Sequence, residues 1–414
     1  MRVLVHQQFH LGHHYQYLAH LLPSLIPLVD EVVVAITPAG AASVEFRSFL
    51  ASFDTHVQFD VILPVADPSL PRKQRWRLHN DLRRAVRRTR PDYVLVPSGD
   101  AQATFLPVFH LSGLGALPYH CPAEFGIHYG LGTGAVGMPA KIKDWIQRKN
   151  FVWSGANRIH VVSFLFYEQL RRCEGSFAER VSLMPHPVPT NPRLTKSESR
   201  RLLAIPEDGR YIGLAASIDS RKAIGEFLAA FRDAAASRLD RVLLAGFIVP
   251  SQMRIIESSF QDLIERGQLI LKAGFLDSAT FQRVLTALDV VCTPYPAFGG
   301  LSSTLLEGVA AGRPVLANAY GWSQAIIERF ELGWTCDIQD HDRFVEAIRT
   351  ALDNSASYHE SEATRRLLAF HAPSNFGDLW VDRIREKKSS AGSLDNRSWS
   401  WVLEALSEDR RFAV

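Results

Sequence analysis

Small polar residues at one predicted strand-to-helix junction have the types and order of an anion-binding turn. An apolar run over residues 289–293 is followed by two glycines and by the hydroxyl-bearing Ser302, Ser303 and Thr304. The backbone N–H groups that begin a helix lack intrahelical partners and carry positive partial charge, so they attract anions. Glycine lets the backbone approach a ligand closely, and the hydroxyls add hydrogen-bond donors. The junction therefore predicts a phosphate site.

The residues after this turn predict a helix with a defined end. Gly312 stands where a left-handed C-terminal cap is expected, and Pro314 prevents the helix from continuing. A plainer interpretation stays open, in which Thr304 and Glu307 form an ordinary Ser/Thr-x-x-Glu capping box. The apolar residues expected to pack this helix recur at helical spacing: Leu301, Leu305, Leu306, Val309 and Ala310.

Length and composition predict a two-domain protein of the cytoplasm. A chain of 414 residues exceeds the usual size of one core. Its 47% hydrophobic and 21% charged residues are typical of a soluble globular protein. No apolar run is long enough for a membrane span, and the N-terminus reads as a first strand instead of a signal peptide. The cysteines lack metal spacing, and a net charge of +3 gives no reason to expect nucleic-acid binding.

Strands alternate with helical patterns throughout, which predicts an α/β fold of two doubly wound, Rossmann-like domains with parallel sheets. We expect an N-terminal domain over residues 1–190 and a C-terminal domain over 207–375, joined by a linker at 185–206. Residues 376–414 form a C-terminal helical segment, for which a return to the N-terminal domain is one option. The expected strands are 2–6, 31–37, 57–63, 93–97, 116–120, 158–163 and 181–184, then 211–216, 241–246, 269–274, 289–293, 314–317 and 334–337.

The turn after the first strand is a candidate acceptor-side site. Gly12 lies directly after that strand, where open α/β sheets bind ligands, and His13 and His14 follow it. With His10 these histidines suggest a metal, but no carboxylate or cysteine completes a ligand set, so we expect no metal. A polar contact with an acceptor from His13 or His14 and a plain surface role both stay open.

Two basic segments of the first half are candidate contact surfaces. Residues 72–90 hold nine basic residues, and the spacing of Leu78, Leu82 and Val86 predicts an amphipathic helix. Its outward face carries Arg83, Arg84, Arg87 and Arg88. This face is either solvated or in contact with an anionic acceptor or an anionic membrane surface. Residues 141–153 alternate aromatic and basic side chains, after a glycine-rich loop over 126–137 that could fold over a substrate.

Several stretches resemble, in order, the motifs of retaining glycosyltransferase family 4, whose GT-B fold has two doubly wound domains facing a cleft. The resemblance covers residues 1–385 and rests on 156–163, 183–188, 216–223, 243–246, 269–275, 287–294 and 306–315. It implies transfer of a hexose from a nucleotide-sugar donor to an acceptor hydroxyl, with retention and without a metal or other cofactor. It further implies a role in polysaccharide, glycolipid or glycoconjugate synthesis, with a sugar- or lipid-linked acceptor.

The resemblance also implies roles for single residues. Glu307 matches the carboxylate that holds the donor ribose, and Lys222 matches the lysine that neutralises the diphosphate. Gly274 and Phe275 match the strand end that lines the base pocket, and His120 is the candidate for the histidine near the reacting sugar. The turn that would cup the diphosphate comprises Gly300, Leu301, Ser302, Ser303 and Thr304.

Two positions depart from the family pattern. Gly299 stands where the family has a glutamate that faces the sugar, and Ser217 stands where it has an arginine that faces the diphosphate. Arg221 could substitute for that arginine. A different donor geometry and a weakened enzyme are both compatible with these changes. Two further alternatives stay open: an inverting GT-B enzyme with His13 or His14 as general base, and a non-catalytic GT-B partner protein.

Overall fold

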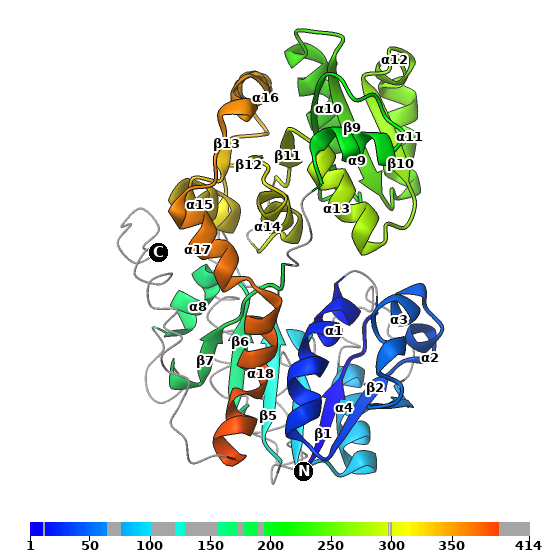
Figure 1. Ribbon diagram of the computed structural model, residues 1–414, viewed down its shortest axis with the longest axis vertical. Helices are drawn as coiled ribbons and strands as arrows, with labels where there is room; N and C mark the ends of the chain where they lie inside the picture. The colour runs from blue at the N-terminus through cyan, green and yellow to red at the C-terminus, as the bar shows by residue number, and fades with distance from the viewer. Residues whose placement is uncertain are drawn as a thin grey trace. The chain divides into compact units, whose positions relative to one another are not determined.

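The computed structural model describes residues 1–10, 13–63, 76–100, 121–128, 156–171, 178–188, 194–296, 298 and 300–388. The chain folds into two compact units. Unit 1 comprises the described residues up to Pro187 together with those from Pro373 onward. Unit 2 comprises Val188–Ala372 (Figure 1). The chain therefore leaves unit 1, builds unit 2, and then returns to unit 1.

Unit 1 is built on a parallel sheet. Its central strands are continuous apolar runs that are buried on both faces, as expected for a parallel sheet covered by helices. The order of the described strands reverses beside β1, which pairs with both β2 and β4. Across the sheet this order is β3 (Gln58–Val61), β2 (Glu31–Ile36), β1 (Arg2–His6), β4 (Tyr93–Val96), β5 (Ala123–Ile127), β6 (Arg158–Val161) and β7 (Val181–Leu183).

Helix α18 (Pro373–Lys388) returns to unit 1 and packs against α1 (His14–Leu25) (Figure 1). The ring of Phe376 lies 5.0 Å from that of Tyr17, and Trp380 is fully buried beside His160. The other helical segments described in unit 1 are η1 (Ile26–Leu28), α2 (Pro38–Ala41), α3 (Val44–Phe49), η2 (Ala51–Phe53), α4 (Trp76–Thr89), α8 (Phe164–Arg171) and η4 (Ala178–Arg180).

Unit 2 repeats the parallel architecture. Strand β8 lies where the order reverses, between β9 and β11. The order of the described strands is β10 (Leu269–Ala273), β9 (Asp240–Gly246), β8 (Arg210–Ala215), β11 (Val290–Thr293), β12 (Val315–Asn318) and β13 (Gly333–Cys336). Its helical segments are α9 (Lys196–Leu202), α10 (Ile224–Ala234), α11 (Pro250–Ser259), α12 (Gln261–Glu265), α13 (Ser278–Ala287), α14 (Ser303–Ala310), α15 (Gly321–Phe330), α16 (His341–Asn354), η5 (Ser355–Ser357) and α17 (Glu362–Phe370).

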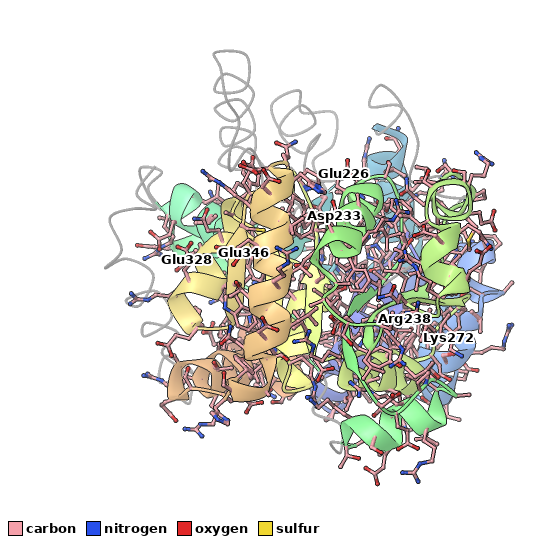
Figure 2. The ribbon with its side chains drawn as sticks, turned by 90° about the horizontal axis from the view of Figure 1, so that it is seen from above. Glu226, Asp233, Arg238, Lys272, Glu328 and Glu346 are labelled. Atoms are coloured by element: carbon pink, nitrogen blue, oxygen red, sulfur yellow. The ribbon has the colours of Figure 1, made fainter. Side chains whose placement is uncertain are left out.

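Helices α10 and α16 pack side by side over one part of the unit 2 sheet (Figure 2). Phe227 of α10 and Phe344 of α16 meet in the core with ring centroids 6.1 Å apart. Asp340 caps α16 by accepting a hydrogen bond from the Arg343 backbone N–H at 3.1 Å, as its position before a helical pattern predicts. This cap fixes where α16 begins, three residues before the core residue Phe344.

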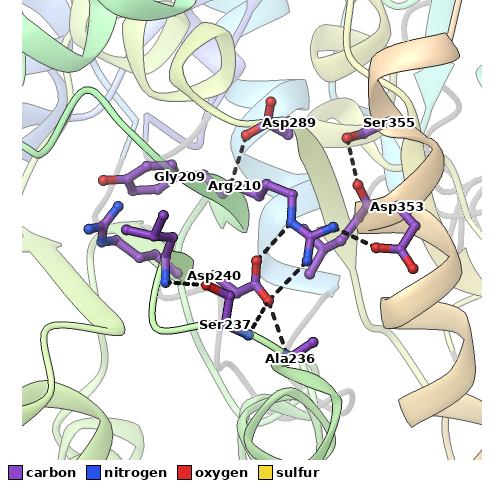
Figure 3. A network of polar contacts seen from close by, with 12 residues as sticks. Gly209, Arg210, Ala236, Ser237, Asp240, Asp289, Asp353 and Ser355 are labelled. Carbon is purple, nitrogen blue, oxygen red and sulfur yellow. Dashed lines mark hydrogen bonds and ion pairs between the residues drawn. The ribbon is translucent and has the colours of Figure 1, made fainter.

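An ion-pair network joins elements at the amino ends of the unit 2 strands (Figure 3). Arg210, at the start of β8, donates to Asp240 of β9 at 2.8 and 3.0 Å and to Asp353 of α16 at 2.5 Å. Asp240 also accepts the backbone N–H groups of Ala236 and Ser237, each at 3.1 Å. These contacts hold the amino ends of the strands, whereas parallel sheets bind ligands at the carboxyl ends.

The structure differs from the sequence-based expectation in two segments. Strand β5 was not predicted, and the strand expected at 116–120 falls outside the described residues. The expected linker contains α9, whose Arg200 donates to Asp289 at 2.7 Å and so ties α9 into unit 2. Among the described residues, no helix has the length and apolar character that crossing a bilayer requires.

Helix α4 has the amphipathic character that its sequence predicts. Leu78, Leu82 and Val86 are buried. Arg84, Arg87 and Arg88 are exposed and Arg83 is half-buried, with Arg88 lying 3.3 Å from Asp60. The segments 126–137 and 141–153 fall largely or wholly outside the described residues.

Candidate functional site

The turn before α14 is a helix start whose first N–H groups remain available. Ser302 is the N-cap, and its hydroxyl accepts the Leu305 N–H at 3.4 Å. Within the described chain, the N–H groups of Ser303 and Thr304 have no hydrogen-bond partner. They lie at the carboxyl edge of the sheet, after β11, where parallel sheets bind ligands. This arrangement has the geometry of an anion site.

The capping-box interpretation of Thr304 and Glu307 is wrong. Thr304 lies inside the helix, and its buried hydroxyl donates to the Ala215 carbonyl of β8 at 3.2 Å. Its side chain therefore fixes α14 to the adjacent strand instead of capping the helix. The predicted helix end is confirmed, because Gly312 has φ 75° directly after the C-cap. Gly300 is buried, and Leu301 is half-buried.

Glu307 lies one turn into α14 in a buried environment. The amide of Gln282, from α13, donates to its carboxyl at 3.0 Å. Burial raises the pKa of Glu307 to about 8, and the Gln282 hydrogen bond opposes this shift. A carboxyl group of this kind can accept hydrogen bonds from ligand hydroxyls once it is ionised.

Lys222 lies beside the start of α14. Its ammonium donates to the Ser217 carbonyl and lies 5.2 Å from the centroid of the Tyr295 ring. Tyr295 in turn hydrogen-bonds Ser302, the N-cap of α14. Burial lowers the pKa of Lys222 to about 8; Asp219 opposes this shift and Arg221 adds to it. The structure thus brings together a buried cation and the N-terminus of α14, two features that stabilise phosphate oxygens.

The remaining predicted residues of this loop lie at the surface. Ser217 is exposed and presents its carbonyl to Lys222. Arg221 is exposed, and its guanidinium lies 2.7 Å from the Asp219 carboxylate. The substitution of Arg221 for the family arginine stays a prediction. Gly299 lies outside the described residues.

Two exposed phenylalanines follow neighbouring strands at the same edge. Phe275 follows β10 and is 54% exposed, and Phe247 follows β9 and is 60% exposed. Gly274 and Gly246 precede them with φ 136° and 116°, and the Gly274 N–H donates to the Gly246 carbonyl at 3.0 Å. Phe247 was not predicted. Its signal was the repeated tripeptide Ala-Gly-Phe at the ends of both strands.

Unit 1 has a second cluster, in which imidazole rings surround Tyr17. The rings of His13, His128 and His186 lie 4.7, 5.0 and 5.6 Å from the Tyr17 ring. These residues follow β1, β5 and β7, so they also lie at the carboxyl edge of their sheet. His14 lies next to His13, with ring centroids 5.0 Å apart.

Hydrogen bonds orient the rings of this cluster. The Tyr17 hydroxyl and His186 Nδ1 are 2.7 Å apart, and His14 Nδ1 lies 2.7 Å from the Ser98 hydroxyl. His128 Nε2 lies 2.7 Å from the Pro97 carbonyl, which can only accept, so this nitrogen carries a proton. The His128 backbone N–H donates to the Asp100 carboxylate at 3.1 and 3.2 Å.

Burial keeps most of this cluster uncharged. It lowers the pKa of His14 and of His186 to about 3 and that of His13 well below its usual range, and the neighbouring imidazoles lower them further. Neutral imidazoles can donate and accept hydrogen bonds, which suits recognition of hydroxyl groups. No group of His, Cys, Asp and Glu among the described residues is arranged to hold a metal.

The sequence analysis found part of this cluster. His13 and His14 were predicted, whereas Tyr17, His128 and His186 were missed. Gly12 and His120 lie outside the described residues. The signal for His128 was its position after residues 123–127, where the apolar residues Ala123, Phe125 and Ile127 alternate as in a strand.

Part of the second unit matches a known family in sequence, and known structures share the fold of the chain. Residues 209–354 match the family model described as glycosyl transferases group 1. This match contains Lys222, Phe275 and Glu307. The second unit therefore contains a domain that is similar to glycosyl transferases group 1. No curated protein sequence matches it significantly.

Solved structures share the fold of nearly the whole chain. Sucrose-phosphate synthase from Thermosynechococcus elongatus is 16% identical and has a TM-score of 0.71, over 95% of this chain and 100% of that one. HepE from Anabaena, solved with UDP-glucose, is 15% identical with a TM-score of 0.62, and the match covers 94% of this chain and 100% of that one. The UDP-forming trehalose-phosphate synthase from Burkholderia vietnamiensis is 10% identical with a TM-score of 0.62, and the match covers 93% of this chain and 99% of that one. The predicted GT-B fold of two doubly wound parallel sheets is confirmed.

Proposed function

We propose that this protein is a glycosyltransferase that moves a hexose from a uridine diphosphate sugar to an acceptor hydroxyl, with retention and without a metal. The observation that carries the proposal is the contact chain from Lys222 through Tyr295 to Ser302, which couples a buried cation to the N-terminus of α14. The binding of UDP-glucose by HepE, a protein of the same fold, supports the choice of donor. Polysaccharide, glycolipid or glycoconjugate synthesis is the role we infer for the transfer.

The chemistry of the donor side follows from charge. Cleavage of a sugar–phosphate bond leaves negative charge on the departing diphosphate. Lys222 and the N–H groups of Ser303 and Thr304 are preorganised donors that stabilise this charge in a partly dry site. Glu307 accepts the ribose hydroxyls, and Phe275 and Phe247 offer ring faces to the base.

The acceptor side is assigned to the imidazole cluster around Tyr17. His128, His13 and His14 are the residues through which we expect the acceptor sugar to be held, since imidazole nitrogens pair with hydroxyl groups. The low pKa of His14 and of His13 argues against the inverting alternative. A general base works best when its pKa is near the operating pH, and these two rings are weak bases at neutral pH.

The exposed arginines of α4 support a lipid-linked acceptor. Arg84, Arg87 and Arg88 project from the helix that buries Leu82 and Val86. A row of arginines on one helix face is attracted to anionic lipid headgroups. We therefore propose a cytoplasmic enzyme that contacts an anionic membrane surface peripherally. Co-sedimentation with phosphatidylglycerol vesicles, compared with phosphatidylcholine vesicles, tests this contact.

The proposed reaction is tested by binding and by product stereochemistry. Calorimetry should detect UDP binding to the full-length chain in the presence of EDTA. Absence of binding to any nucleoside diphosphate would favour the non-catalytic partner. NMR of the first product formed from UDP-glucose should show an axial anomeric bond, as in the donor, whereas an equatorial bond would establish inversion.

A further inference from the structure

A groove of about 590 Å³ lies in unit 2 among the starts of α10 and α16 and the length of α11. Ser220, Ala223 and Pro296 line it, and they neighbour Lys222 and Tyr295 in the chain. The donor-site residues proposed above do not line it. Its volume falls within the range of small-molecule sites. The groove is therefore a cavity that the proposed reaction leaves unused.

Gln252 is the feature of this groove that points to a ligand. It lies on α11 facing the groove and is only 8% exposed. Within the described chain its side-chain amide makes no hydrogen bond, although it carries donors and an acceptor. Its polar atoms are not among the fully enclosed ones that lack a partner, so they remain accessible from the groove. A ligand in the groove would supply these partners.

The start of α10 adds further unpaired donors. Its N-cap, Ala223, has no side chain that could cap the helix, and the N–H groups of Ile224 and Gly225 have no partner within the described chain. Gly225 lines the groove and adds no side chain over this backbone. The groove therefore presents hydrogen-bond donors of the helix start together with the Gln252 amide.

The charges around the groove select against an anion. Among the described residues that line it there is no lysine or arginine, and the ionisable ones are Glu226 and His341. His341 Nε2 lies 2.8 Å from Asp233, which adds a second carboxylate nearby (Figure 2 shows Glu226 and Asp233 on α10). The apolar part of the lining includes Ile255, Ile338 and Ala229. A neutral ligand with many hydroxyl groups would satisfy the amides, the carboxylate and the apolar surface together.

We propose that this groove binds an uncharged saccharide at a site separate from the donor site. The ring hydroxyls accept from the α10 N–H groups, exchange hydrogen bonds with Gln252 and donate to Glu226. The sugar C–H face lies against Ile255 and Ile338. The assignment stands whether or not the residues around Lys222 bind a nucleotide sugar.

The test uses the full-length chain, with maltose, cellobiose and lactose as probes. The δ1 methyl groups of Ile255 and Ile338 are followed by NMR during each titration, because they report on the groove itself. We expect at least one disaccharide to shift both methyl signals, with a Kd on the order of 1 mM. Two variants should weaken that binding at least tenfold. Gln252→Leu removes the amide at nearly constant shape, and Gly225→Leu fills the groove.

Controls separate this site from the rest of the protein. Glu257→Gln, on the exposed face of α11, should bind the disaccharide like the wild type. Gly225→Leu should fold, because a Cβ at this position would lie 3.8 Å from Ile255, an ordinary contact. UDP affinity, measured on the same variants, should be unchanged, and it reports separately on the proposed donor site. The proposal is overturned if no disaccharide shifts the two methyl signals, or if Gln252→Leu and Gly225→Leu bind like the wild type.

Discussion

At the scale of single residues, the candidate donor site depends on two ionisable groups held away from water. Lys222 and Glu307 come from different elements, and each has a pKa of about 8 because of burial. Their charges are therefore readily changed by a ligand. A bound diphosphate favours the charged form of Lys222, and ribose hydroxyls favour the ionised form of Glu307. Ligand recognition at this site is thus coupled to protonation.

Replacement of Lys222 is expected to impair the transfer step. Lys222→Ala removes the buried ammonium, while the N–H groups of α14 remain. By comparison with the loss of one oxyanion donor, kcat should fall by about 10²- to 10³-fold, or about 3 kcal/mol. Steady-state kinetics with UDP-glucose measures this. Lys272→Ala, on the half-buried face of β10, is the control and should retain wild-type kcat; undiminished turnover in Lys222→Ala would refute the assignment.

UDP affinity is expected to rise with pH as Glu307 ionises. The free protein holds this carboxyl protonated below its pKa of about 8, whereas ribose hydroxyls bind better to the carboxylate. Kd should therefore fall by up to about tenfold per pH unit below 8 and rise again above 8, where Lys222 loses its charge. Calorimetry across about pH 6–9 checks this, with Glu307→Gln as the control that lacks the titrating group. A wild-type curve that follows the variant's would contradict a contact between Glu307 and the ribose.

The raised pKa of Glu307 has a matching effect on stability. A carboxyl whose pKa is higher in the folded state stabilises the fold most at low pH, below its unfolded value of about 4.3. That stabilisation is lost as the pH rises through about 8. The unliganded wild type should therefore lose more stability than Glu307→Gln between about pH 6 and 9, as urea unfolding at each pH would measure.

At the scale of elements, the amino ends of the unit 2 strands are held by polar contacts while the carboxyl ends carry the candidate sites. Arg210 illustrates the first role, because it joins β8, β9 and α16 (Figure 3). Thr304 joins α14 to β8 near the other edge. The start of α14 is therefore attached to β8 by a side-chain contact that leaves the N–H groups of Ser303 and Thr304 available.

The two carboxylates bound by Arg210 are expected to differ in their contribution to stability. Asp240 is 1% exposed and also accepts two backbone N–H groups, so Asp240→Asn should cost about 2 kcal/mol. Asp353 is 67% exposed, so the pair is screened by solvent and Asp353→Asn should cost less than about 1 kcal/mol. Urea unfolding of both variants measures the difference. Equal losses would contradict the role of burial.

The sequence predicts elements better than it predicts their side-chain roles. The apolar runs of the parallel strands were found because burial on both faces makes them continuous, and the start of α14 was found from local order. Lys222 was found only through the resemblance to a known family. Among Ser302, Ser303 and Thr304, however, only the folded backbone determines which hydroxyl caps and which one reaches Ala215. The cluster around Tyr17 draws on several strand ends, and no local pattern in one sequence brings His128 and His186 together.

At the scale of the whole molecule, unit 1 depends on a helix that follows unit 2 in the sequence. Trp380 of α18 is fully buried, with its ring 4.5 Å from that of His160. Phe376 of the same helix contacts Tyr17, a member of the candidate acceptor-side cluster. The C-terminal helix therefore supports the residues that we assign to acceptor binding.

Truncation of Trp380 is expected to destabilise unit 1 selectively. Trp380→Ala leaves a cavity between α18 and the sheet, at a cost of about 3–5 kcal/mol. UDP binding is expected to raise the unfolding temperature of unit 2, which identifies the unit 2 transition in calorimetry. Trp380→Ala should lower the unfolding temperature of unit 1 and leave the unit 2 transition unchanged. Trp334→Ala is the control variant, because Trp334 lies on β13 of unit 2 and is half-buried. It should lower the unfolding temperature of the UDP-sensitive transition. A uniform shift of both transitions by Trp380→Ala would contradict the division into two units.

The return of α18 to unit 1 also sets an order for biosynthesis. Ribosomes make the chain from its N-terminus, so α1 is complete long before Pro373 is added. Until then the α1 surface around Tyr17 has no α18 to cover it, whereas unit 2 already has its whole sheet once β13 is made. The nascent N-terminal unit is therefore the part of this protein that chaperones would bind, and it matures only after the second unit has emerged.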